Sequence, residues 1–349
     1  MRVGIYSPYD RSETALMALT TASTLQRQGV LVDWLAPRIR LPVSPMWDGR
    51  VRRMRVAADA ARWGLRCRQR IWFVSDSAVF SRVKPIDQYA DNILVASWGG
   101  LPDEGLGLLR AFNLVVCPSR YMAHRLDTIV GGINVYVQPF SLGLMPHCHP
   151  SPPHTALIYA DGYTTRRYDR WLVALARQLD GLKGGNVLAL DGTVDTGCRR
   201  ALRDLRNTTC VFSPDFGVLL DVMAGARWFI DVSARPSAAM LATAAMSMGA
   251  VPICWKTATT KEIICADVDG LLVECGLRRQ LSGAEIAVLD GQHTSPAAIS
   301  VSALGDMNRW EMLRTNARGR ALDTAGSAPS SFWQRITEER WRAQYSEQV

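Results

Sequence analysis

Two adjacent arginines, Arg166 and Arg167, lie in a short polar segment between an apolar run and a helical pattern. The apolar run Ala156–Ala160 predicts a strand, and the following Tyr168–Leu179 predicts a helix. A planar guanidinium suits phosphate oxygens, and the first turn of a helix directs backbone N–H groups at anions. The pattern favours an anion site at the start of this helix. The alternative is a pair of exposed arginines without a ligand.

A second set of polar residues follows strands further along the chain. The apolar runs Phe229–Val232, Val251–Trp255 and Leu271–Val273 predict strands, and Ala238–Met248 predicts a helix that Gly249 ends. This alternation builds a parallel sheet, and ligands bind at the carboxyl ends of the strands of such a sheet. We therefore expect a binding edge whose candidate residues are Asp161, Gly162, Arg167, Ser233, Ser237, Thr243, Thr259, Thr260, Lys261 and Glu262. For Glu262, the alternative is a carboxylate at a helix start, which the helix dipole favours.

The first half of the chain shows the same alternation, which predicts a doubly wound α/β lobe. Strands are expected at Val3–Tyr6, Leu31–Leu35, Ile71–Val74, Ile93–Ala96, Leu114–Cys117 and Val135–Gln138, and helices at Ser12–Arg27 and Tyr121–Ile129. Candidates for binding a second substrate follow three of these strands: Tyr9, Ser12, Asp76, Trp98 and Gly99. Glu13 opens the first helix, where its carboxylate either polarises a bound hydroxyl or caps the helix. Trp98 offers a flat surface for stacking on a sugar or a base.

Arginines concentrate between residues 50 and 70. If Val51–Cys67 is helical, four of them share one side: Arg52, Arg55, Arg62 and Arg66. Such a basic helix could bind nucleic-acid phosphates or anionic lipid headgroups, or could be a solvated face. The adjacent apolar face has no Phe or Ile, so nucleic acid is favoured over a membrane.

Composition sets broad limits on the function. The chain has 349 residues, 48% of them hydrophobic, and a formal net charge of +8. This length suits two globular domains, and the positive charge favours anionic partners. No apolar run reaches about 18 residues, and the eight cysteines form no Cys-x-x-Cys pair. We therefore expect a cytoplasmic protein without a metal site.

Prolines and histidines cluster in Met145–His154, which predicts a linker because clustered prolines interrupt helices and strands. We expect a first lobe at residues 1–145, a linker at 146–155 and a second lobe at 156–328. The tail at 329–349 has the spacing of an amphipathic helix. A metal site formed by His147, Cys148, His149 and His154 is the disfavoured alternative for the linker.

The second lobe resembles the nucleotide-sugar half of the family-four (group one) glycosyltransferases, which have the two-lobed GT-B fold. The residues that stand in the family's order and spacing are Ser233, Ala245–Met246, Gly249, Glu262–Ile264 and Gly270–Val273. The resemblance implies two Rossmann-like lobes with parallel sheets and a C-terminal helix that crosses back to the first lobe. It also implies a retaining, metal-independent transferase, with a UDP- or GDP-sugar as co-substrate and no further cofactor.

The resemblance also implies roles for particular residues. Arg166 and Arg167 would bind the donor diphosphate, and Lys261 would help to stabilise its charge. Two acidic residues of the family, eight positions apart, fall here at Pro236 and Ala244. Their absence leaves open a GT-B protein that binds nucleic acid or a sugar nucleotide without catalysis.

The resemblance further implies an acceptor bound by the first lobe. Some phage enzymes of this fold glycosylate hydroxymethylated bases in DNA, and an arginine-rich chain suits that acceptor, with the host cytoplasm as its location. An exposed or flipped base would then stack on Trp98 or Tyr9. The alternative acceptors are an envelope glycan and a lipid-linked sugar.

Overall fold

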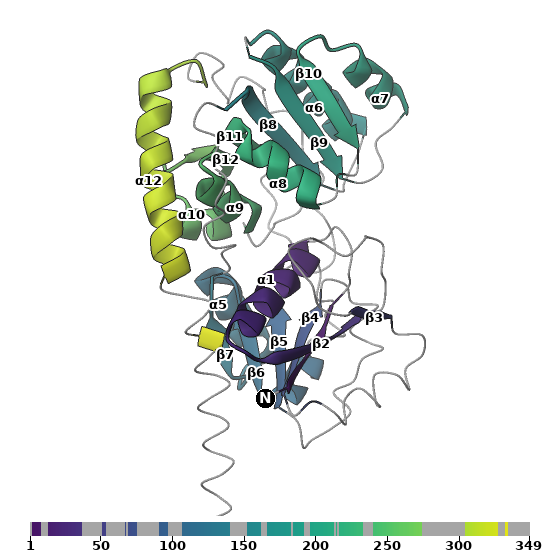
Figure 1. Cartoon of the computed structure of the whole chain (residues 1–349), viewed down its shortest axis with the longest axis vertical. Coiled ribbons are helices and arrows are strands. Elements are labelled where there is room, and N and C mark those ends of the chain that lie inside the picture. Colours follow the sequence, from purple (N-terminus) through teal and green to yellow (C-terminus); the bar gives the residue numbers. More distant parts are fainter. Residues whose placement is uncertain are drawn as a thin grey trace, which may run out of the picture. The chain divides into compact units, whose positions relative to one another are not determined.

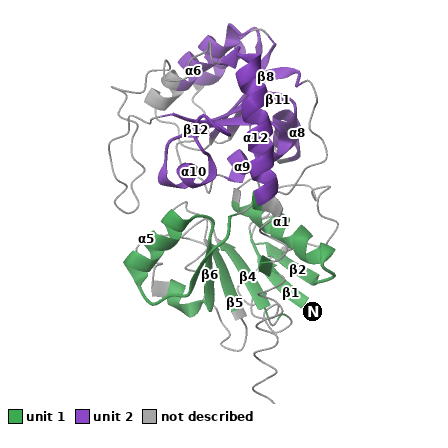
Figure 2. Ribbon diagram, turned by 90° about the vertical axis from the view of Figure 1, so that its left-hand side faces the viewer, with its two compact units in different colours: residues 1–141, 324–349 green, residues 142–323 purple. Residues whose placement is uncertain are grey.

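The structure is a computed structural model (Figure 1). It describes residues 2–7, 13–36, 51–53, 67, 69–74, 91–96, 107–139, 152–161, 166–182, 184–191, 196–212, 214, 216–232, 240–273, 304–326 and 332–333. The chain divides into two compact units, residues 1–141 with 324–349 and residues 142–323 (Figure 2). Each unit contains its own parallel sheet and its own helices, which confirms the predicted α/β fold with two Rossmann-like lobes.

The first unit has a seven-stranded sheet with the order β3-β2-β1-β4-β5-β6-β7. Its strands are β1 (Arg2–Tyr6), β2 (Leu31–Ala36), β3 (Val51–Arg53), β4 (Gln69–Val74), β5 (Asp91–Ala96), β6 (Leu114–Cys117) and β7 (Val135–Val137). Its helices are α1 (Glu13–Arg27), the 3-10 helix η1 (Gly107–Ala111) and α5 (Arg120–Val130). The strand order reverses between β1 and β4, so the loops that follow these two strands lie where Rossmann-type sheets bind ligands.

The second unit has a six-stranded sheet with the order β10-β9-β8-β11-β12-β13. Its strands are β8 (His154–Asp161), β9 (Asn186–Asp191), β10 (Thr208–Phe212), β11 (Ala226–Asp231), β12 (Val251–Trp255) and β13 (Leu271–Val273). Its helices are α6 (Arg166–Asp180), α7 (Thr196–Arg203), α8 (Phe216–Ala224), α9 (Met240–Met248), α10 (Ala258–Ile263) and α12 (Met307–Gly326), the last three residues of which belong to the first unit. The order reverses between β8 and β11.

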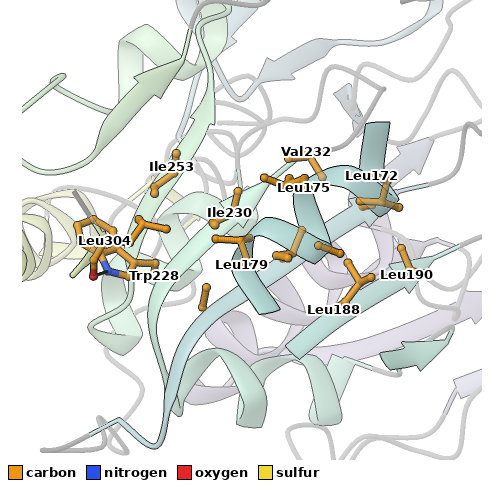
Figure 3. Close-up of a cluster of buried hydrophobic side chains, with 14 of the residues drawn as sticks. Leu172, Leu175, Leu179, Leu188, Leu190, Trp228, Ile230, Val232, Ile253 and Leu304 are labelled. Carbon is orange, nitrogen blue, oxygen red and sulfur yellow. Dashed lines mark hydrogen bonds between the residues drawn. The ribbon is translucent and has the colours of Figure 1, made fainter. Parts of the chain in front are cut away.

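Two different apolar patterns in the sequence produce this core, one in the strands of the sheet and one in the helices that cover it. Residues 155–160 of β8 are all buried, as expected for a central parallel strand that helices cover on both faces. Helix α6 instead buries Leu172, Leu175, Ala176 and Leu179, which share one face at a helical period (Figure 3). Each buried leucine contributes roughly 1.5–3 kcal/mol to the free energy of unfolding.

Trp228 on β11 connects this core to the segment before α12. Its side chain is fully buried, and its Nε1 donates a hydrogen bond to the carbonyl oxygen of Leu304 at 3.1 Å (Figure 3). In return, Nε1 of Trp310 on α12 donates to the carbonyl oxygen of Arg227 at 3.0 Å. The guanidinium groups of Arg227 and Arg314 lie 5.9 and 5.0 Å from the centre of the Trp310 ring. Hydrogen bonds from these two tryptophans therefore connect the start of α12, and the segment before it, to the start of β11.

Two residues near the C-terminus pack on the first unit. Phe332 and Trp333 are buried, and their rings meet edge to face with centroids 4.9 Å apart. Phe332 also stacks on Tyr136 of β7, with centroids 4.7 Å apart. The chain thus contributes residues from both ends of its sequence to this unit.

Three features differ from the sequence analysis. The expected helix at Val51–Cys67 is wrong at its start, because Val51–Arg53 forms edge strand β3 with Trp34, Leu35 and Ala36 of β2 as partners. Arg55, Arg62 and Arg66 lie outside the described residues, so the basic helix loses Arg52 and stays a prediction for the rest. His154 begins β8 and does not belong to a linker.

The third difference is α12, which the sequence analysis did not predict. Its buried residues Trp310, Leu313, Ala317 and Ala321 have helical spacing, but Met312 and Leu322 are exposed apolar residues and obscure the period. None of the described helices combines the length and the hydropathy of a membrane span.

Candidate functional site

The carboxyl ends of β8, β11 and β12 lie side by side at the point where the strand order of the second unit reverses. Asp231 pairs with Tyr159 of β8 and with Cys254 of β12, so the three strands end at similar levels. From these ends the chain runs into α6, α9 and α10, respectively. Ligands bind at this place in open α/β sheets. The sheet therefore brings together the three segments that hold the candidate residues.

The segment after β8 places two arginines in the first turn of α6. Asp161 is the last residue of the strand, and Arg166 and Arg167 are the first two residues of the helix. A helix N-terminus already carries partial positive charge, so each arginine there is unfavourable by about 0.3–1 kcal/mol unless an anion is present. Helix stability alone therefore does not explain these arginines. Gly162 lies outside the described residues.

The segment after β11 leads into α9, whose nine residues are all buried. Thr243 is one of them, and its carbonyl oxygen accepts a hydrogen bond from the hydroxyl of Ser247 at 2.9 Å. Ser233 and Ser237 lie outside the described residues, so their roles stay predictions.

The helix α9 ends in a Schellman motif at Gly249, which has a φ of 81°. The N–H of Gly249 donates to the carbonyl of Met246 at 3.1 Å, and the N–H of Ala250 donates to that of Ala245 at 2.9 Å. The positions Ala245–Met246 and Gly249, which the resemblance singled out, thus define a helix terminus.

The segment after β12 is a reciprocal threonine cap on α10. Thr260 N–H donates to the hydroxyl of Thr257 at 3.1 Å, and Thr257 N–H donates to the hydroxyl of Thr260 at 2.8 Å. The Thr260 hydroxyl donates in turn to the carbonyl of Trp255 at 2.6 Å. Thr260 is buried, so its hydroxyl serves to hold the turn together. Its expected contact with a ligand stays a prediction.

The remaining candidates on α10 are open to solvent. Lys261 and Glu262 are exposed, and Thr259 is half-buried. Glu262 is the penultimate residue of α10, so the alternative that it lies at a helix start is wrong. A carboxylate near a helix C-terminus faces the negative end of the helix dipole, which is unfavourable.

Asp269 is a buried carboxylate in the turn between α10 and β13. Asp269 is 3% exposed at its side chain, and its Oδ1 accepts a hydrogen bond from the N–H of Cys265 at 2.7 Å. Burial raises the pKa of Asp269, although Arg320 of α12 lies 3.3 Å from its Oδ2 and opposes that rise. The same guanidinium donates to the carbonyl oxygen of Glu262 at 3.2 Å.

Sequence reasoning missed Arg320. It stands 58 positions from Glu262, and the helix that carries it was not predicted. No local signal in the sequence pairs these two residues.

In the first unit, β1, β4 and β5 are neighbours, and the acceptor candidates follow their ends in the sequence. Tyr9, Ser12, Asp76, Trp98 and Gly99 all lie outside the described residues. Glu13 is the first residue of α1, as its pattern predicted. The acceptor roles of these residues stay predictions.

No protein-family model and no curated protein sequence matches the chain. Solved structures match it over nearly its whole length. HepE from Anabaena, in complex with UDP and glucose, is 12% identical with a TM-score of 0.66, and the match covers 100% of both chains. The pneumococcal O-GlcNAc transferase GtfA, in complex with UDP and GlcNAc, is 8% identical with a TM-score of 0.72, covering 97% of this chain and 99% of that one.

The sucrose-phosphate synthase from Thermosynechococcus elongatus is 14% identical with a TM-score of 0.62, covering 99% of this chain and 100% of that one. The chain therefore has the fold of these proteins, the two Rossmann-like lobes of GT-B glycosyltransferases.

Proposed function

We propose that the chain is a glycosyltransferase that moves a sugar from a nucleotide-sugar donor to an acceptor hydroxyl. The observation that carries this proposal is the edge where β8, β11 and β12 end, because it combines the reversal of strand order with arginines that begin a helix. The likeness to solved structures that hold UDP supports a nucleoside diphosphate as the ligand of this edge.

In the proposed reaction the diphosphate of the donor lies at the start of α6. Arg166, Arg167 and Lys261 stabilise the negative charge that grows on the diphosphate as its bond to the sugar breaks. Fixed cations of this kind suit a metal-independent mechanism. In a retaining reaction the departing phosphate takes the proton of the acceptor hydroxyl on the same face of the sugar, and Glu13 of the first unit polarises that hydroxyl.

For the acceptor, we propose a hydroxymethylated base in DNA, on the ground of the arginine content of the chain. The strand β3 removes Arg52 from the basic helix that first suggested this acceptor. The proposal for the acceptor is therefore separate from the proposal for the donor, and a different measurement tests it.

The donor proposal is tested with a panel of UDP-, GDP- and ADP-sugars, scored by release of the nucleoside diphosphate. We expect Arg166→Ala and Arg167→Ala each to lower kcat/KM for the active donor by about 100-fold, the usual cost of removing one charge-stabilising group. The same variants should unfold at an unchanged or slightly higher temperature, because each removes a cation from a helix N-terminus. Arg177→Ala is the control, since it changes an exposed arginine in the last turn of α6.

Three outcomes separate the alternatives. Binding of a donor without release or transfer would favour an inactive binding protein. An equal loss of activity in the Arg177→Ala control would contradict the role of the first turn. Absence of binding for every nucleotide in the panel would overturn the proposal. The anomeric configuration of the product, read by NMR, tests retention, and activity in the presence of EDTA tests metal independence.

A further inference from the structure

We propose that Arg320 is a positioning residue that holds α10 in place at the edge of the donor site. This inference rests on the proposed function, since α10 carries the donor candidates Thr259, Lys261 and Glu262. Arg320 itself comes from α12, which follows β13 in the chain and lies beside α10 (Figure 1).

Arg320 makes two contacts, one to α10 and one to the turn before β13. Its Nη2 donates to the backbone carbonyl of Glu262 at 3.2 Å, and its Nη1 lies 3.3 Å from the Oδ2 of Asp269. Carbonyl groups in the last turn of a helix have no partner within the helix. One guanidinium therefore supplies a donor to the last turn of α10 and connects it to a buried carboxylate.

Asp269 holds the Arg320 guanidinium on the side away from α10. The Asp269 carboxylate is held by the N–H of Cys265, and its side chain is 3% exposed, so it has little freedom to move. Removing one partner of an ion pair costs more free energy when the remaining charge is buried than when it is exposed. Asp269 therefore fixes the Arg320 guanidinium, and the guanidinium fixes the end of α10.

Helix α12 is itself held in place by contacts at several points along its length. Trp310 and Trp228 fasten its start to β11, and Ala317 and Ala321 pack against Met246 of α9. The amide of Asn316 donates to the carbonyl of Val268 at 2.8 Å. A helix held along its length can transmit a fixed position to α10, whereas α10 has only six residues and is too short to be a stable helix by itself.

Another arginine on the same helix offers a matched control. Arg309 forms an ion pair with Asp267 at 2.6 Å, in the same turn that contains Asp269. Asp267 is exposed, and no bond from Arg309 to α10 is among the interactions of the described residues. Removing Arg309 therefore changes α12 and the turn while leaving the carbonyl of Glu262 bonded.

The test measures the binding of UDP, GDP and ADP separately, by isothermal titration calorimetry on the full-length chain. We expect Arg320→Met to lower the affinity for the nucleotide that the wild type binds by about tenfold. Substitutions at residues that do not touch a ligand can have effects of this size through coupling. Arg309→Met should leave the affinity within about twofold, because exposed ion pairs contribute little. Arg320→Lys has one nitrogen for two acceptors and should give an intermediate affinity. Circular dichroism establishes the temperature at which every variant is folded.

Equal affinity in wild type and Arg320→Met would overturn the positioning role and leave the proposed function standing. Equal weakening in Arg320→Met and Arg309→Met would also overturn it, since that result indicates general loosening of α12. A wild type that binds none of the three nucleotides would overturn the proposed function and this inference together. If Arg320→Met does not fold, Arg320→Lys takes its place, and wild-type affinity in that variant would overturn the inference.

Discussion

At the scale of single residues, Gly270 is a position where close packing leaves no room for a side chain. A Cβ at this position would lie 2.8 Å from Cγ2 of Ile264 and 2.9 Å from the carbonyl oxygen of Pro252. The carbonyl belongs to strand β12 and cannot move aside cheaply. We expect Gly270→Ala to lower the free energy of unfolding by about 1–3 kcal/mol, the usual cost of overpacking, as measured by urea denaturation.

Gly319 gives the opposite sign and serves as the control. It lies within α12, and a Cβ there would meet no atom within 4 Å. Gly319→Ala should raise the free energy of unfolding by about 0.5–1 kcal/mol, because alanine loses less backbone entropy in a helix. Equal effects in the two variants would contradict the packing explanation for Gly270.

Part of the candidate site follows from residue types alone. The sequence placed Arg166 and Arg167 at a helix start after a strand, because charged residues interrupt an apolar pattern at that point. It could not reveal that the Thr260 hydroxyl is buried in a cap or that Arg320 reaches Glu262. Such contacts depend on how side chains meet across elements, and hydrophobic periodicity carries no information about them.

At the scale of elements, Asp180 joins the end of α6 to the start of β10. Its carboxylate accepts hydrogen bonds from the N–H groups of Arg206 and Asn207, at 3.1 and 2.7 Å, and from the hydroxyl of Thr208 at 2.9 Å. Desolvation acts to raise the pKa of Asp180, but these hydrogen bonds together outweigh it and lower the pKa. The ionised carboxylate therefore stabilises the folded state.

The sign of the pH dependence follows from that lowered pKa. Asp180 contributes its stability above the unfolded pKa of 3.8, and the contribution is lost as the pH falls through the still lower folded pKa. We expect Asp180→Asn to lower the free energy of unfolding by about 1 kcal/mol at pH 7. The difference from wild type should shrink below about pH 4. Asp204→Asn, at an exposed aspartate, should have little effect at any pH, and a constant difference for Asp180→Asn would refute the assignment.

Most elements were predictable because buried strands and amphipathic helices have different apolar periods. Both central strands, β8 and β11, appear as continuous apolar runs. The errors fall where this signal is weak. A three-residue edge strand such as β3 is too short to show a period, and pairing with β2 decides its conformation. Helix α10 consists mainly of polar residues, so its threonine cap is the feature that defines it.

At the scale of the whole molecule, the division of roles between the two units remains a proposal. The second unit carries the described part of the donor edge, while the acceptor candidates of the first unit follow β1, β4 and β5. Loops that follow strand ends are polar and vary freely in sequence. The fold was therefore more predictable than the acceptor, whose recognition depends on such loops.

Net charge gives the acceptor proposal a quantitative test. Replacing Arg52, Arg55, Arg62 and Arg66 with alanine lowers the formal net charge of +8 by four units. If these residues bind DNA phosphates, duplex affinity should fall, and the slope of log K against log salt should decrease by about 0.9 for each lost contact. A control with the same charge change replaces the exposed residues Arg177, Arg200, Arg203 and Arg206 of the second unit.

Fluorescence anisotropy with a duplex at several salt concentrations measures both quantities. The first variant should lose affinity and slope, whereas the control should lose less of each, because long-range attraction between charges is screened beyond about 8–10 Å. Identical salt slopes in the wild type and the first variant would remove DNA as the proposed acceptor. An envelope glycan would then be favoured, since binding a neutral hydroxyl does not require phosphate contacts, and the donor proposal would be unaffected.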